Sequence, residues 1–392
     1  MTGPRLRAIP VPSGEAALGI LADLQGALDG TGPAVTPHAL NSPAPSLGDE
    51  SIQLPEGLAV AISTSGSTGR PKLAMLTGDA LRASADATHR RLGGGPGRWL
   101  LALPAHHIAG IQVLIRSLVA GTTPAAMDLT GGFTAAAFAR ATAGLASSTG
   151  AYTALVPTQL IRLLASDEGC QALTRYDAVL VGGSATPSGV LAEARDAGVR
   201  VVTTYGMSES SGGCVYDGRP LDVSAAQLEP DGRIRLGGST IALGYLGEPA
   251  LSAAAFVVDE RTGQQWFRTD DAGHLEDGDV LVVDGRIDDL ISTGGLTVAP
   301  RQVEEALTGL DNVAEAVVVG SIDPEWGQLV SAAIVLTPGS PPPTLDEVRE
   351  RLRDLVPDHA LPRRLATLAA LPVRGPGKPD RAAVRRHFDH DQ

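Results

Sequence analysis

The sequence is poor in aromatic residues and cysteine and has no long apolar run. Aromatic side chains make up 3% of the 392 residues, so the core must be built from alanine, valine, leucine and isoleucine. Two cysteines, Cys170 and Cys214, are too few for a disulfide framework, and we expect both to be small buried or half-buried thiols. No segment approaches 18 consecutive apolar residues, and no basic stretch leads into an apolar core. We therefore expect no transmembrane helix and no signal peptide. By default we expect the protein to be cytoplasmic.

Basic residues are also in the minority. The 31 lysines and arginines face 44 aspartates and glutamates, which gives a formal net charge of -13. Nucleic acids and anionic membrane surfaces select basic patches, so we expect neither as a partner. The length suggests two or three domains with an ample core. A small anionic ligand is still compatible with this composition. Local basic residues would have to bind it, because the protein as a whole is acidic.

A polar stretch with the sequence STSGSTGRPK, Ser63–Lys72, follows the apolar run Leu58–Ile62. The run is typical of a buried strand. A strand that enters a glycine- and hydroxyl-rich loop is the layout of a phosphate cradle, because glycine lets backbone N–H groups turn toward an anion. Lys72 is followed by Leu73, so the stretch is not a Walker A loop. A flexible polar turn is the alternative interpretation.

Short apolar runs alternate with helical patterns in the middle of the chain. Ala154–Val156, Ala178–Val181 and Arg200–Thr204 are expected strands. This alternation predicts a mostly parallel sheet, in which ligands bind at the carboxyl ends of the strands. Gly182–Thr186 and Tyr205–Ser210 each follow one of these strands, so we expect them to line such a crevice.

Other segments complete the large N-terminal part. We expect a helix at Gly14–Gly30, a loop from Gly30 to Pro55, a helix at Gly78–Leu92 and a buried strand at Trp99–Pro104. A β-rich region is expected over Arg233–Val283, with strands at IRL, TIALGYL and VLVV.

The apolar run IQVLIRSLVAG, which ends at Gly121, predicts a helix that carries one charge, Arg116. An unpaired charge is costly to bury. Arg116 should therefore either reach solvent with its side chain extended or meet a carboxylate.

The C-terminal part alternates strands and helices. We expect strand, loop, helix and strand over Leu290–Gly320, with the helix beginning at Pro300–Leu307, then a strand at Ser331–Leu336 and a helix at Leu345–Val356. This is the pattern of a compact α+β domain of roughly 100 residues.

Five segments resemble, in order, the motifs of the adenylate-forming superfamily of acyl-CoA synthetases, adenylation domains and luciferases. They are TSGSTGRPK at Thr64–Lys72, YGMSES at Tyr205–Ser210, WFRTDDAG at Trp266–Gly273, GRIDDLISTGG at Gly285–Gly295 and GPGKPDR at Gly375–Arg381. The resemblance implies an α/β fold with mostly parallel sheets flanked by helices, a β-rich subdomain and a small mobile α+β lid. It divides the chain into residues 1–287 and a lid of residues 288–392, with Asp288 as the hinge.

The resemblance implies that the protein uses ATP and Mg²⁺, with CoA as a co-substrate. It also implies which residues form the site. The implied nucleotide-binding residues are Thr64, Ser65, Gly66, Ser67, Thr68, Gly69, Lys72, Gly182, Gly183, Ser184, Tyr205, Gly206, Ser208, Asp271 and Arg286. Glu209 matches the Mg²⁺ ligand, and Lys378 matches the lysine that enters the site for the first half-reaction. The superfamily usually has glycine where this chain has Asp270, directly before the ribose-binding Asp271.

The stretch LPAHHIAGIQVLIRSLVAG is similar to a narrower group, the o-succinylbenzoate–CoA ligases of menaquinone biosynthesis. The superfamily resemblance places His107 and Gly206 in the acyl pocket, and the narrower similarity places Arg116 opposite the aromatic carboxylate of the acid. Two alternatives remain: another aryl or short-acyl acid–CoA ligase, and a catalytically inactive nucleotide-binding relative. With no carrier-protein segment after residue 392, a peptide-synthetase module is disfavoured. The N-terminal portion is shorter than is usual in the superfamily, and the oligomeric state stays open, with a homodimer among the alternatives.

Overall fold

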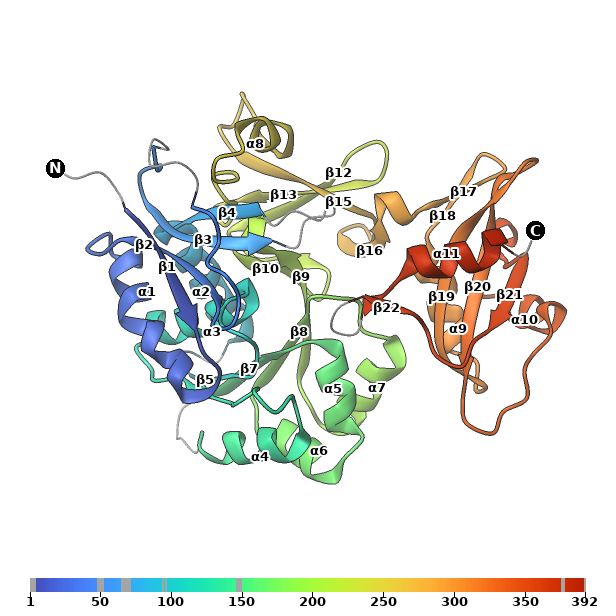
Figure 1. Ribbon diagram of the computed structural model, residues 1–392, viewed down its shortest axis with the longest axis horizontal. Coiled ribbons are helices and arrows are strands. Elements are labelled where there is room, and N and C mark those ends of the chain that lie inside the picture. Colours follow the sequence, from blue (N-terminus) through green and yellow to red (C-terminus); the bar gives the residue numbers. More distant parts are fainter. Residues whose placement is uncertain are drawn as a thin grey trace.

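The structure is a computed structural model of the chain. It describes residues 5–47, 53–64, 72–93, 95, 97–145, 150–374 and 378–390, and at 373, 374, 378 and 390 only the backbone. Figure 1 shows two bodies: a larger one built by the first three quarters of the chain and a smaller C-terminal one. None of the described helices is long and apolar enough to cross a membrane.

The N-terminal sheet has the strand order β1-β2-β3-β4, with parallel pairing as far as β3 and antiparallel pairing of β3 with β4. Its elements are β1 (Leu6–Val11), the 3-10 helix η1 (Gly14–Ile20), α1 (Leu21–Leu28), β2 (Ala34–Ala39), β3 (Leu58–Thr64) and β4 (Lys72–Thr77). The expected loop after Gly30 is therefore wrong at β2. Pro37 made this segment resemble a loop. In the structure Pro37 lies opposite Ile9 of β1, and the pairing of β2 with β3 is confined to Val35 and Val60.

A seven-stranded sheet of order β11-β10-β9-β8-β7-β5-β6 forms the centre, and its strands from β5 to β9 are parallel. The strands are β5 (Arg98–Leu101), β6 (Ala125–Ala126), β7 (Ala151–Leu155), β8 (Ala178–Gly182), β9 (Val201–Met207), β10 (Gly212–Tyr216) and β11 (Arg219–Pro220). The mostly parallel sheet is confirmed. However, β9 runs on to Met207, so Tyr205 and Gly206 lie within a strand rather than after it.

Helices cover both faces of the central sheet because side chains alternate along each strand. Leu101 and Leu180 pack toward α2 and α3, whereas Leu100 and Val179 pack toward α4 to α6. The helices are α2 (Gly78–Leu92), α3 (Ile108–Val119), α4 (Ala135–Ala143), α5 (Pro157–Leu164), α6 (Asp167–Leu173) and α7 (Ser188–Asp196). The lower row of α4 to α7 in Figure 1 shows one of these two layers.

The third sheet is antiparallel, in the order β12-β13-β15-β14, with β16 paired to β15. It consists of β12 (Ser224–Leu228), β13 (Arg233–Gly238), β14 (Phe256–Val258), β15 (Gln265–Glu276) and β16 (Val280–Arg286), with α8 (Pro249–Ala255) beside it. The segment TIALGYL, expected as a strand, is instead irregular. Its backbone bonds to β4 (Leu246 N–H to Leu73 O, 2.9 Å), which joins the third sheet to the first.

The 3-10 helix η3 (Ile287–Asp289) leads into the smaller body, a sheet of order β18-β17-β20-β19 with β21 paired to β20. Its elements are β17 (Ile291–Thr293), β18 (Leu296–Val298), α9 (Pro300–Thr308), β19 (Val313–Asp323), β20 (Gly327–Leu336), α10 (Leu345–Leu352), η4 (Asp358–Ala360), β21 (Arg364–Thr367), β22 (Val373–Arg374), β23 (Lys378–Pro379) and α11 (Arg381–His390). Helix α10 ends at Leu352, four residues before the expected Val356, and turn residues follow it. Pro357 disfavours helical backbone only at Val356, the residue directly before it.

Candidate active site

The ends of the predicted phosphate loop are fixed by one hairpin. Thr64 ends β3, Lys72 begins β4, and the two residues are paired opposite each other. The predicted loop residues Ser65, Gly66, Ser67, Thr68 and Gly69 lie outside the described residues. The hairpin brings the two ends of the loop together and directs the lysine toward the next element of the site.

That element is η2 (Ser208–Ser210), a single 3-10 turn between β9 and β10 that packs against β3 and β4. Glu209 in this turn is 7% exposed. Its Oε1 accepts a hydrogen bond from the Tyr245 hydroxyl at 2.9 Å, and the Lys72 ammonium lies 4.9 Å from the centre of the Tyr245 ring. Burial raises the pKa of Glu209, while Tyr245 and Lys72 act in the opposite direction.

The Glu209 carboxylate could bind a hard divalent cation that is also bound by phosphate oxygens. The nearby Lys72 ammonium could bind the phosphate oxygens directly. The structure thus brings together Lys72 and Glu209, which the sequence placed in one site. Sequence reasoning missed Tyr245, because TIALGYL was interpreted as an ordinary strand.

Tyr205 and Asp271 form the second cluster of the site. The Tyr205 hydroxyl donates to Asp271 Oδ2 at 2.8 Å, and burial raises the pKa of that carboxyl. Asp271 in β15 is paired opposite Arg286 in β16, but the Arg286 guanidinium donates to Asp270 at 3.0 Å. The unexpected Asp270 therefore holds the arginine, and Asp271 is bound by the tyrosine.

Glycines bring the backbone close at the same edge of the central sheet. Gly182 ends β8 and is followed by Gly183, whose φ of +82° favours glycine, and by the exposed Ser184. A Cβ on Gly206 would lie 2.2 Å from the carbonyl oxygen of Gly212, so only glycine allows β9 and β10 to approach here. A flat ligand can reach the backbone at this edge, as predicted for parallel sheets.

His107 precedes α3 as its N-cap residue and is exposed, with its ring 4.4 Å from the His106 ring. The pKa of His106 is lowered to about 4 by burial and by the neighbouring His107 and His38. Gln112, one turn into α3, donates to the Ser211 carbonyl oxygen at 2.8 Å. Helix α3 is thereby held against the η2 turn that carries Glu209.

Arg116 lies about one turn beyond Gln112 on α3 and is 3% exposed, so the expectation that it reaches solvent is wrong. No aspartate or glutamate in the described part of the chain forms an ion pair with it. Its guanidinium lies 5.0 Å from the Trp99 ring, and Nη2 donates to the Tyr216 hydroxyl at 3.3 Å. Burying the guanidinium costs free energy because its charge loses water. The contact with the Trp99 ring offsets part of this cost, in place of the solvent or carboxylate that the sequence led us to expect.

Several buried nitrogens near this arginine have no hydrogen-bond partner in the described structure: Arg116 Nε, Trp99 Nε1 and His89 Nε2. His89 packs beside Trp99, with ring centroids 6.2 Å apart. Its pKa is lowered by burial and by the charge of Arg116. Sequence reasoning did not single out His89 or Trp99.

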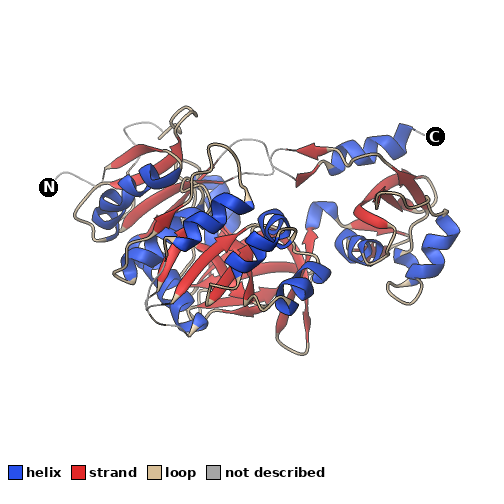
Figure 2. Cartoon of the chain, turned by 90° about the horizontal axis from the view of Figure 1, so that it is seen from below, coloured by secondary structure: helices blue, strands red, loops and turns tan. Residues whose placement is uncertain are grey.

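Lys378 begins β23, and only its backbone is described. It is paired antiparallel with Arg374 of β22. Figures 1 and 2 both show this short hairpin on the side of the smaller body that faces the larger one. Asp288, the expected hinge residue, is exposed within η3. Helix α9 contacts the larger body through Arg301, which donates to the Val283 carbonyl oxygen at 2.7 Å.

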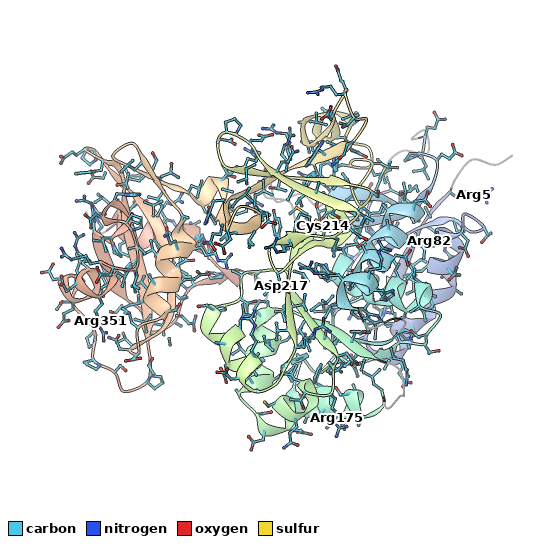
Figure 3. All side chains as sticks on the ribbon, turned by 180° about the vertical axis from the view of Figure 1, so that it is seen from behind. Arg5, Arg82, Arg175, Cys214, Asp217 and Arg351 are labelled. Carbon is cyan, nitrogen blue, oxygen red and sulfur yellow. The ribbon has the colours of Figure 1, made fainter. Side chains whose placement is uncertain are left out.

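The cysteines behave as expected. Cys170 is half-buried, whereas Cys214, labelled in Figure 3, is 1% exposed where β10 packs on the third sheet. Burial raises the pKa of the Cys214 thiol to about 12. A neutral, enclosed thiol cannot act as a nucleophile at neutral pH.

Known proteins share both the sequence pattern and the fold. Residues 19–275 match the AMP-binding enzyme family, and residues 302–378 match the AMP-binding enzyme C-terminal domain. A probable 2-succinylbenzoate–CoA ligase from Mycobacterium tuberculosis H37Rv is 45% identical over 98% of both chains. The 2-succinylbenzoate–CoA ligase of Bacillus licheniformis is 31% identical over 84% of this chain and 70% of its own length.

The fold is also similar to a solved structure. The o-succinylbenzoate CoA synthetase of Bacillus subtilis, in complex with its acyl-adenylate intermediate, superposes with a TM-score of 0.74 at 23% identity. The match covers 98% of this chain and 89% of that one. The expected α/β architecture with a larger and a smaller body is confirmed. The chain belongs to the AMP-binding enzyme family.

Proposed function

We propose that this protein is an AMP-forming o-succinylbenzoate–CoA ligase that supplies a thioester for menaquinone biosynthesis. The observation that carries the proposal is the Arg116 guanidinium, which is buried on Trp99 without a carboxylate partner among the described residues. The names of the two relatives, at 45% and 31% identity, support the same acid.

The chemistry of the acid explains the arginine. o-Succinylbenzoate has one carboxylate to be activated and a second one on its aromatic ring. A buried cation with an unpaired Nε is costly alone but favourable when a ligand supplies an anion. A monocarboxylic acid would leave the cation unpaired. A dicarboxylate would supply that anion, and His107 and Gly206 would then lie nearer the reacting end.

In the first half-reaction, an oxygen of the succinyl carboxylate attacks the α-phosphorus of ATP, and pyrophosphate leaves. The attacking group is already an anion, so no general base is needed. Lys72 and the hydroxyl-rich loop would bind the pyrophosphate end, and Glu209 would hold Mg²⁺ there. Bound Mg²⁺ neutralises charge on the phosphate oxygens. Tyr205, Asp271 and Arg286 would position the nucleoside, because transfer to phosphorus depends mainly on positioning and charge.

The second half-reaction forms the thioester. The CoA thiol gives its proton to solvent, its sulfur bonds to the acyl carbon, the bond from that carbon to the phosphate oxygen breaks, and AMP leaves. We propose that residues 288–392 rotate about Asp288 between the two steps, placing Lys378 at the carboxylate first and withdrawing it afterwards. The position of the β22–β23 hairpin on the facing side of the smaller body supports this assignment.

Pyrophosphate release over a panel of acids tests the proposal. With ATP and Mg²⁺, we expect o-succinylbenzoate to support release, and Arg116→Ala to abolish most of it. Arg162→Ala, an exposed arginine on α5, is the control and should behave as the wild type. Equal turnover of benzoate or fatty acids, indifferent to Arg116, would favour the broader acid–CoA ligase instead. No release with any acid would support the inactive nucleotide-binding relative.

A further inference from the structure

Tyr245 lies between the two charged residues at the phosphate end of the site. Its hydroxyl donates to Glu209 Oε1 at 2.9 Å, and its ring centre is 4.9 Å from the Lys72 ammonium. The three residues come from three separate elements: β4, the η2 turn and the irregular segment before α8. One side chain therefore contacts both the proposed metal ligand and the proposed phosphate ligand.

The backbone and ring of Tyr245 are held on several sides. Its N–H donates to the Ser252 hydroxyl at 2.8 Å, and the flanking residues bond to β4. Phe256 packs edge-on against the ring at a centroid distance of 5.3 Å, and the side chain is 5% exposed. The hydroxyl therefore has a fixed direction, which is what a group that orients another needs.

The Tyr245 ring also belongs to the main hydrophobic core, and a purely structural role is the simpler interpretation. Two contacts go beyond packing. The hydroxyl is bonded to a buried carboxylate rather than to a backbone group, and the ring face meets an ammonium. A hydrogen bond to a charged, buried acceptor fixes the acceptor more firmly than a neutral one does.

We propose that Tyr245 is a positioning residue for the metal–triphosphate end of the nucleotide. Its hydroxyl fixes the Glu209 carboxylate in the orientation that binds the divalent cation. Its ring holds Lys72 at the end of the hairpin, ready for the phosphates. The inference deepens the proposed function at the same site but concerns nucleotide and metal alone, whatever acid is used.

The test is calorimetric binding of an ATP analogue with a methylene bridge between the α- and β-phosphorus, with and without Mg²⁺. We expect Mg²⁺ to strengthen binding to the wild type. In Tyr245→Phe, which keeps the ring, we expect this increment to fall about tenfold, because the lost bond has a charged acceptor. Binding without Mg²⁺ should change little, because the ring still holds Lys72.

Tyr176→Phe is the matched control. This tyrosine is equally buried, and its hydroxyl bonds to Thr142 at 2.7 Å in the core below the central sheet. It should lose stability without losing the Mg²⁺ increment. A second variant, Tyr245→Met, removes the ring and keeps Lys72, so it tests the ring contact: analogue binding should weaken both with and without Mg²⁺.

An unchanged Mg²⁺ increment in Tyr245→Phe would overturn the inference, and so would an equal loss with and without Mg²⁺. Unchanged binding without Mg²⁺ in Tyr245→Met would overturn the role of the ring. The result is independent of the acid assignment. If no acid yields pyrophosphate while Tyr245→Phe loses the increment, the proposed function fails and the role of Tyr245 stands.

Discussion

Arg116 combines a stability cost with a proposed role in binding. Its guanidinium is buried, and its Nε lacks a partner in the described structure. Replacing a buried ion by a hydrophobic residue of similar length is often neutral or stabilising by about 1–4 kcal/mol. We therefore expect Arg116→Met to unfold at the same or a higher denaturant concentration than the wild type while it loses activity. Urea unfolding measures this change.

Arg162→Met, on the exposed face of α5, is the control and should leave both properties unchanged. A loss of more than about 2 kcal/mol in Arg116→Met would contradict the account, because the arginine would then stabilise the fold through its packing against Trp99.

His106 should make the stability depend on pH. Its pKa is about 4 in the folded protein against an ordinary value of 6.5, so the unfolded state binds more protons between these values. Stability should therefore rise with pH from 4 to 6.5 and level off above. In His106→Asn this part of the slope should be lost, as measured by urea unfolding at several pH values.

His359→Asn, in the η4 turn of the smaller body, removes an imidazole outside the His38–His106–His107 group. A slope that is lost in His106→Asn but kept in this variant belongs to the His38–His106–His107 group. An unaltered slope in His106→Asn would mean that other groups carry the acid sensitivity.

Among the elements, β23 is tied to the smaller body by Arg381, three residues after Lys378. Its guanidinium donates to both carboxylate oxygens of Glu304 on α9, at 2.6 and 2.9 Å, and to the Val318 carbonyl oxygen at 2.7 Å. A lysine side chain cannot form this bidentate pair of hydrogen bonds. We expect Arg381→Lys to destabilise the smaller body by about 2 kcal/mol and to speed amide exchange at Lys378, the only β23 residue with an N–H group, and in early α11.

Arg386→Lys, on the exposed side of α11, provides the comparison and should exchange as the wild type does. If both variants exchanged alike, the Arg381–Glu304 pair would not be what fixes the strand that carries Lys378.

Local signals predicted some elements well. Helix α2 has the bounds expected from sequence, because Thr77 caps its first turn through a bond from Ala80 N–H and Gly93 ends it with a φ of +73°. The strand β2 was missed because its pairing partners are distant and Pro37 reads as a turn. TIALGYL was misassigned because it joins β4 through a few backbone hydrogen bonds and one isolated bridge rather than through a continuous strand ladder.

At the scale of the whole molecule, the five motifs located most of the proposed site because each has its own pattern. The contacts between them were not predictable. Tyr245 reaches Glu209 across 36 residues, and Arg116 meets Tyr216 across 100, so neither partner could be read from spacing. The burial of Arg116 against Trp99 depends in the same way on how α3 packs on β5.

The central claim is that this chain selects an acid with a second carboxylate. The most direct measurement is kcat/KM for o-succinylbenzoate and for 3-benzoylpropionate, which lacks the ring carboxylate, in the wild type and in Arg116→Met. We predict that the wild type prefers the dicarboxylate by about 100-fold, because an acid without the ring carboxylate leaves the buried Arg116 cation unpaired. Arg116→Met should remove most of this preference. Equal kcat/KM values for the two acids in the wild type would contradict the account.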